Sequence, residues 1–87
     1  MDKFLGVKTM ARKVLSAEQK SLNEKVGKII QEKRHFYNMT KTEVAKILDI
    51  QPIMIDHYEN GDVTIPSATL LKMCEIFQCE VKDLLQN

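Results

Sequence analysis

The sequence predicts a small all-α domain of five helices that follows a basic N-terminal arm. Apolar residues recur at the three- and four-residue spacing of a buried helix face, and helix-capping patterns separate the segments. The 87 residues include only three glycines and two prolines, which leaves little material for a loop-rich or all-β structure. A chain of this length has room for one domain. We place the arm at residues 1–20 and the domain at residues 21–87.

The first helix of the domain is expected to begin at Ser21 and to end near His35. Ser21 is a good N-cap residue, and Glu24 three positions later completes a capping box. The residues that follow place an apolar stripe on one helix face, formed by Leu22, Val26, Ile29 and Ile30.

Two short helices joined by a tight turn come next. Thr40 and Glu43 form a second capping box, which begins a helix that ends before Asp49. At Asp49 we expect a left-handed backbone conformation, which Asp tolerates less readily than Gly. Pro52 then opens the third helix, because its missing N–H would have no partner at the first helical position.

Turn residues also mark the remaining helices. Asn60-Gly61 ends the third helix with strong turn chemistry, and Ile55 and Tyr58 are expected on its inner face. Ser67 is expected to cap a fourth helix. A short fifth helix at residues 81–85 completes the predicted core.

The segment MTKTEVAKILDIQPIMIDHYENG resembles the Cro/C1-type helix-turn-helix family. The match includes the capped start at Thr40, a small residue at Ala45 where the two helices meet, and Tyr58 on the inner face. IPSATLLKMCEIFQCEVKDLL resembles the closing helix pair of the same family. The resemblance implies a five-helix, lambda-repressor-like helix-turn-helix domain over residues 21–87.

A narrower pattern is similar to multiprotein bridging factor: LNEKVGKIIQEKR, then Pro52, then IDHYENG followed by IPS. This resemblance implies a non-catalytic factor that binds the small ribosomal subunit, both rRNA and ribosomal proteins. It also implies maintenance of the reading frame on stalled or collided ribosomes, and transcription coactivation through the TATA-binding protein. The chain is shorter than that pattern at its N-terminal region, which weakens the coactivator role more than the ribosome contact.

Charge is distributed unevenly along the chain. Residues 1–35 carry nine basic groups against four acids, a net charge of +5, whereas residues 36–87 carry four against eight, a net charge of −4. A polyanion should therefore meet the N-terminal part first. The basic residues expected to contact nucleic acid, if they are not an ordinary solvated surface, are Lys3, Lys8, Arg12, Lys13, Lys20, Lys28 and Arg34.

In a DNA-reading helix-turn-helix the second helix lies in the major groove, with its first exposed residues on the base edges. Here those positions fall to Gln51, Pro52, Ile53, Asp56 and His57. Gln51 is the one good base reader among them, and Ile53 offers contact with a thymine methyl group or with a protein. Lys41 can hold a phosphate at the start of the preceding helix. We therefore take Lys41, Gln51, Ile53 and His57 as the candidate contacts of the helix pair.

No pattern in the sequence predicts an enzyme, a cofactor, a metal site or a small-molecule substrate. Cys74 and Cys79 are five residues apart, which fits neither a CxxC redox pair nor a zinc knuckle, so we expect both to pack in the core. No apolar run is long enough for a membrane span.

Three functions remain in consideration at this point. The first is a nucleic-acid- and ribosome-associated factor of the bridging-factor kind, in the cytoplasm and with the nucleus as a second compartment. The second is a sequence-specific DNA-binding transcriptional regulator of the Cro/C1 type. The third is a transcription coactivator that contacts proteins only, general transcription factors among them.

Overall fold

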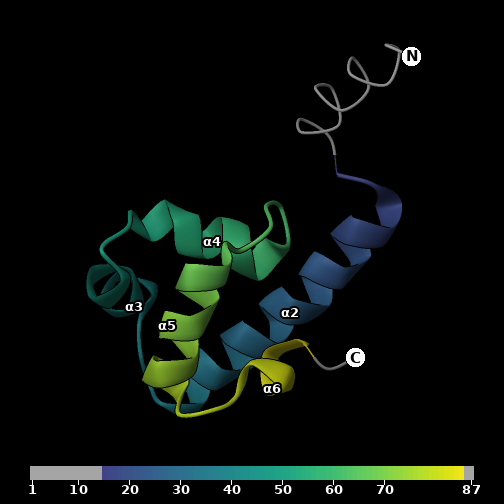
Figure 1. Cartoon of the computed structure of the whole chain (residues 1–87). Helices are drawn as coiled ribbons and strands as arrows, with labels where there is room; N and C mark the ends of the chain where they lie inside the picture. The colour runs from purple at the N-terminus through teal and green to yellow at the C-terminus, as the bar shows by residue number, and fades with distance from the viewer. Residues whose placement is uncertain (1–14, 86–87) are drawn as a thin grey trace.

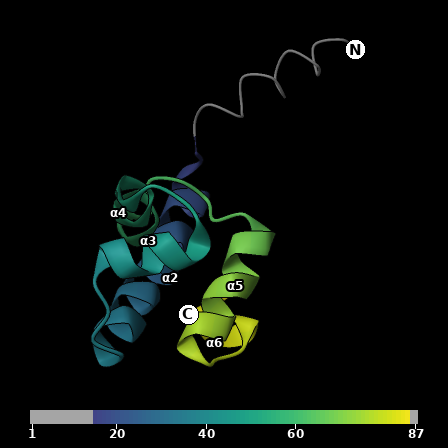
Figure 2. The same cartoon turned by 90° about the vertical axis from the view of Figure 1, so that its left-hand side faces the viewer.

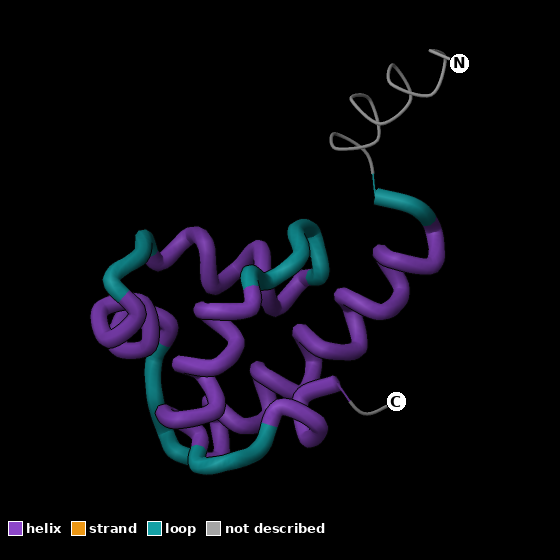
Figure 3. Tube along the Cα trace, in the orientation of Figure 1, coloured by secondary structure: helices purple, strands orange, loops and turns teal. Residues whose placement is uncertain are grey.

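The computed structural model describes residues 15–85, and this part of the chain folds into helices joined by short loops, with no strand (Figure 3). The all-α prediction with five helices is confirmed. The helices are α2 (Ala17–Phe36), α3 (Lys41–Leu48), α4 (Pro52–Asn60), α5 (Ser67–Phe77) and α6 (Val81–Leu85).

The long helix α2 lies along one side of the domain, and α4 and α6 pack against it (Figure 1). The short helix α3 contacts α4 and α5, while α6 folds back beside the end of α5 (Figure 2). Each helix contributes apolar side chains to one shared core. The fully buried members of that core are Ile30, Val44, Ala45, Ile55, Met73, Phe77 and Leu84.

The expected start of the first helix is wrong. The helix begins at Ala17, and Ser16 is its N-cap, with the Ser16 Oγ accepting a hydrogen bond from the Gln19 backbone N–H at 3.0 Å. Ala17 and the three residues after it are all good helix formers, so the helix extends beyond Ser21 to the earlier cap. Lys20 therefore lies within α2.

The expected cap of the fourth helix is also wrong. Pro66 is the N-cap residue of α5, with extended backbone angles, and Ser67 is the first residue inside the helix. Proline fixes φ at the cap, so the helix starts directly after it without a side-chain hydrogen bond.

The cap predicted for the second helix is confirmed. The Glu43 backbone N–H donates to the Thr40 Oγ1 at 3.1 Å, and the Thr40 N–H donates to the Glu43 Oε1 at 2.8 Å. Asp49 has the expected left-handed conformation, with φ of 60°. Pro52 is the first residue of α4, and Gly61 ends that helix with φ of 77°.

One motif ends four of the helices. A residue with positive φ follows each of α2, α3, α4 and α5, and the next N–H donates to the carbonyl five residues back. This is the Schellman arrangement, in which the two residues of the pair also bring their side chains together. The pairs are Arg34 and Met39, Ala45 and Ile50, His57 and Asp62, and Cys74 and Cys79. The spacing of the two cysteines is therefore that of a helix end.

Close packing holds α2 against α4. A Cβ atom added at Gly27 would lie 2.4 Å from the Tyr58 carbonyl oxygen and 2.5 Å from that of Glu59. These are backbone atoms of α4, so no side chain can move aside to make room. Only glycine permits the helices to approach this closely, and α4 is thereby fixed on a long supporting helix.

Candidate nucleic-acid interface

The α3–α4 pair forms a rigid unit. Ala45, 1% exposed, sits where the two helices meet, and Ile55 and Tyr58 bury the inner face of α4 as predicted. The Lys41 Nζ at the start of α3 forms an ion pair with the Asp56 carboxylate in the second turn of α4. This pair links the partly exposed outer surfaces of the two helices.

The start of α4 is open to solvent. Gln51 is its N-cap and has an extended backbone, but its side chain makes no capping hydrogen bond. Gln51 and Pro52 are exposed, and Ile53 is 55% exposed. The structure thus gathers an amide and an aliphatic side chain at the first turn of α4, the position from which a recognition helix contacts base edges.

Two other polar residues of the exposed part of α4, Asp56 and His57, have partners within the protein. The Asp56 carboxylate is neutralised by Lys41, so the acid at this position does not present an uncompensated negative charge. The His57 Nδ1 lies 3.5 Å from the Asp62 Oδ2. A hydrogen bond from Lys20, with a second from His57, lowers the pKa of Asp62 below its ordinary value.

Arg34 is buried and paired within the protein. Its side chain is buried, and the guanidinium donates from Nε to the Glu59 Oε2 at 2.6 Å and from Nη2 to the Glu59 Oε1 at 3.1 Å. A third hydrogen bond runs from Nη1 to the Met39 carbonyl at 2.9 Å. The hydrogen bonds with Glu59 raise the pKa of Arg34 against the opposing effect of burial. Burial and the bidentate pair with Glu59 leave the guanidinium little access to a phosphate, so the structure gives no support to the phosphate contact predicted at Arg34.

The remaining basic candidates are not gathered at one surface. Lys20 is occupied by the Asp62 carboxylate at 3.0 Å and the Gly61 carbonyl at 3.3 Å, both at the end of α4. Lys28 is exposed on α2. Sequence reasoning passed over Lys46, an exposed cation in the last turn of α3, although its place in the helix pair was visible. Lys3, Lys8, Arg12 and Lys13 lie outside the described residues.

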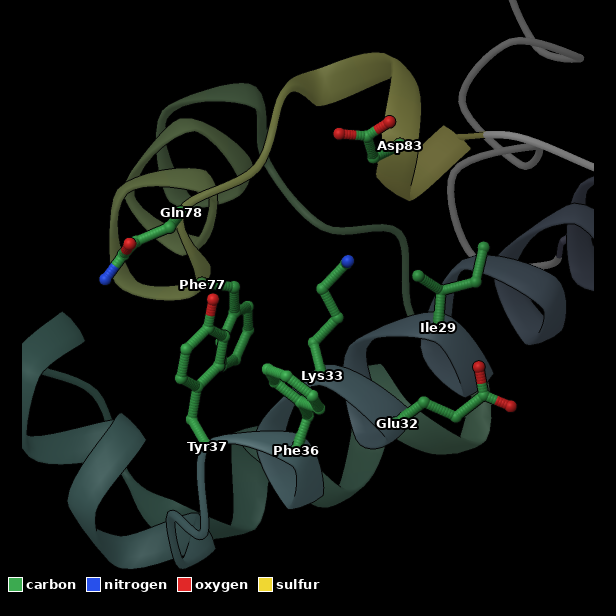
Figure 4. A pocket seen from close by; sticks show the side chains of 8 residues that line it. All are labelled: Ile29, Glu32, Lys33, Phe36, Tyr37, Phe77, Gln78 and Asp83. Atoms are coloured by element: carbon green, nitrogen blue, oxygen red, sulfur yellow. The ribbon is translucent and has the colours of Figure 1, made fainter.

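A separate groove of about 510 Å³ lies between the end of α2, the end of α5 and α6 (Figure 4). Its rings include Phe36, 77% exposed, and Tyr37, which stacks on Phe77 with ring centroids 6.3 Å apart. The residues lining it come from α2, α5, α6 and the adjoining turns, so the groove is distinct from the α3–α4 pair.

Residues 15–85 carry neither a metal-ligand cluster nor a membrane-spanning helix. Within this range, no group of three or more His, Cys, Asp or Glu side chains is placed to hold a metal ion. None of the helices there has the length and apolar character needed to cross a membrane.

Comparison with known proteins yields a family and two solved structures. The restriction-modification controller protein C.AhdI from Aeromonas hydrophila shares the fold at 18% identity, with a TM-score of 0.67 over 71% of this chain and 94% of that one. The clp gene regulator ClgR from C. glutamicum is 25% identical, with a TM-score of 0.68 over 74% of this chain and 83% of that one. No curated protein sequence matches significantly. The family model of the Cro/C1-type HTH DNA-binding domain matches residues 29–86, and the chain therefore belongs to the Cro/C1-type helix-turn-helix family.

Proposed function

We propose that this protein is a sequence-specific DNA-binding transcriptional regulator, in which α4 enters the major groove of duplex DNA. The observation that carries the proposal is the solvent-exposed start of α4 on the rigid α3–α4 pair, within a chain of the Cro/C1-type family. The geometry supports the docking mode of this motif, with the second helix in the groove and the first across the backbone.

The ribosome-associated function is less well supported. The similarity to multiprotein bridging factor rests on the sequence pattern alone, and one of its basic positions, Arg34, is buried against Glu59. The two similar solved structures are a controller protein and a gene regulator, which favours regulation of genes over translation.

The phosphate contacts are assigned to α3. Lys41 is the first residue of that helix, where the backbone amides and the helix dipole also favour an anion, and in the complex its partly exposed ammonium bridges the Asp56 carboxylate and a phosphate. Lys46 adds an exposed cation on the same helix. Affinity for duplex DNA grows with the number of neutralised phosphates. Since α3 and α4 carry few cations, we expect this surface to bind DNA with modest affinity and a shallow salt dependence.

A binding selection from random duplex DNA, followed by gel shift at several salt concentrations, tests the proposal. The protein should enrich one sequence, and Lys41→Ala should weaken binding to every duplex while reducing the salt slope by about one. Lys72→Ala removes an exposed lysine from α5 and is the matched control, which should leave the slope unchanged.

Failure to enrich any duplex would contradict the proposal. Under that outcome, co-sedimentation with small ribosomal subunits at low salt would favour the ribosome-associated function. Binding to transcription proteins, but to neither duplex DNA nor the ribosomal subunit, would favour the protein-only coactivator.

A further inference from the structure

We propose that the first turn of α4 selects an adenine and a neighbouring thymine, with Gln51 on the adenine edge and Ile53 on the thymine methyl group. This inference rests on the proposed DNA-binding function and specifies which bases that site reads. It depends on the exposed side chains at the start of α4 that have no partner within the described part of the protein and are therefore free to contact a base.

Two of the polar candidates on α4 are already engaged. Asp56 is bound to Lys41, and the His57 ring faces Asp62 across 3.5 Å. Pro52 has no N–H to donate and no polar side-chain atom. The side chains left at the exposed start of the helix are therefore one amide and one branched aliphatic group, Gln51 and Ile53.

The Gln51 amide matches adenine better than the other bases. It carries one NH₂ donor and one carbonyl acceptor, and the major-groove edge of adenine presents an N7 acceptor beside an N6 donor. Guanine presents two acceptors at this edge, which would leave the Gln51 carbonyl without a donor. Since the Gln51 side chain makes no capping hydrogen bond to α4, it reaches the base without first breaking one.

Ile53 matches thymine for a different reason. The Ile53 side chain is 55% exposed, at a position near the start of a helix where many polar residues would fit equally well. Packing it on the thymine methyl group removes apolar surface of both partners from water. Cytosine presents an amino group and no methyl group at the same edge. Ile53 packed against cytosine would leave that amino donor without an acceptor.

Base analogues in the selected duplex test each contact at a single atom. Deoxyuridine lacks the thymine methyl group, and 7-deazaadenine lacks the N7 acceptor. At one thymine, deoxyuridine should weaken wild-type binding about three- to fivefold, as expected for one buried methyl group. At one adenine, 7-deazaadenine should weaken it about two- to tenfold, as expected for one hydrogen bond.

The variants assign the two effects to residues. Ile53→Ala should lose the response to deoxyuridine and keep the response to 7-deazaadenine, while Gln51→Ala should do the reverse. Leu71→Ala removes an apolar side chain of equal exposure, 55%, from α5 and should keep both responses. Circular dichroism melting of each variant confirms that it is folded under the binding conditions.

The possible outcomes separate the two proposals. An enriched duplex whose binding is insensitive to both analogues overturns the base assignment and leaves DNA binding intact. The same holds if Ile53→Ala still responds to the methyl group or Gln51→Ala still responds to N7. If no duplex is enriched, both the base assignment and the proposed function are overturned.

Discussion

At the scale of single residues, the ion pair between Arg34 and Glu59 shows how the tertiary structure can bury a charged side chain that the sequence alone would place on the surface. In sequence, Arg34 is one of many cations on a helix rich in lysine, and a surface role is the ordinary expectation. Its partner lies 25 residues later, on α4. Among the described residues, no buried side-chain nitrogen or oxygen lacks a hydrogen-bond partner, so the pair is part of a fully satisfied interior.

Removing one member of this pair should be costly. Glu59→Ala leaves a buried guanidinium without its counterion, and we expect the free energy of unfolding to fall by about 3–5 kcal/mol. Urea denaturation measures the loss. Glu80→Ala breaks the exposed pair with Lys82 and is the control, with an expected change below about 1 kcal/mol. Equal losses in the two variants would contradict a structural role for the buried pair.

The carboxylate of Asp62 provides a test by pH. Its hydrogen bond from Lys20 lowers its pKa, so Lys20→Met should raise that pKa towards the ordinary value, as measured by NMR titration of the side-chain carbon. A lowered pKa stabilises the fold above the unfolded value of about 4, and this contribution is lost as pH falls through the folded pKa. Lys25→Met, on the same helix, should leave the pKa of Asp62 in place.

At the scale of helices, the ends of the elements show what local sequence does and does not determine. The capping box at Thr40, the left-handed Asp49 and the stop at Gly61 were predictable because each depends on residues within a few positions. The start of α2 was not, since Ser16 and Ser21 are both good caps and the choice depends on the helix formers between them.

The capping box of α3 should contribute measurably to stability. Thr40→Ala removes the acceptor for the Glu43 N–H, and we expect a loss of about 1 kcal/mol in thermal or urea unfolding. Thr42→Ala alters an exposed threonine in the first turn of the same helix and should change stability by less than about 0.5 kcal/mol. If the two substitutions proved equally damaging, loss of the capping hydrogen bond would not account for the effect of Thr40→Ala.

At the scale of the whole molecule, the position of α4 depends on its contact with α2. Gly27→Ala places a methyl group against backbone atoms of α4, and we expect the free energy of unfolding to fall by about 1–3 kcal/mol. DNA affinity should fall with it, because the reading helix shifts on its support. Ser21→Ala, at an exposed position of α2, should leave both quantities unchanged.

The fold was more predictable than the interface. Helix spacing and capping determine the five elements locally, and the resemblance to the Cro/C1 family indicated how they assemble. Which charges remain available is a property of the assembled molecule: Lys20, Arg34 and Asp56 each find a partner far away in the sequence. The exposed start of α4 was predictable in outline, whereas the pairing that isolates Gln51 and Ile53 was not.

The central claim is that α3 and α4 form the DNA-binding surface, and an NMR titration of the protein with its selected duplex tests it most directly. The account predicts that the largest amide shift changes fall at residues 40–46 and 51–57, with saturation at a defined stoichiometry. Changes confined to α5 and α6, or to the groove beside Phe36, with none at the start of α4, would contradict it.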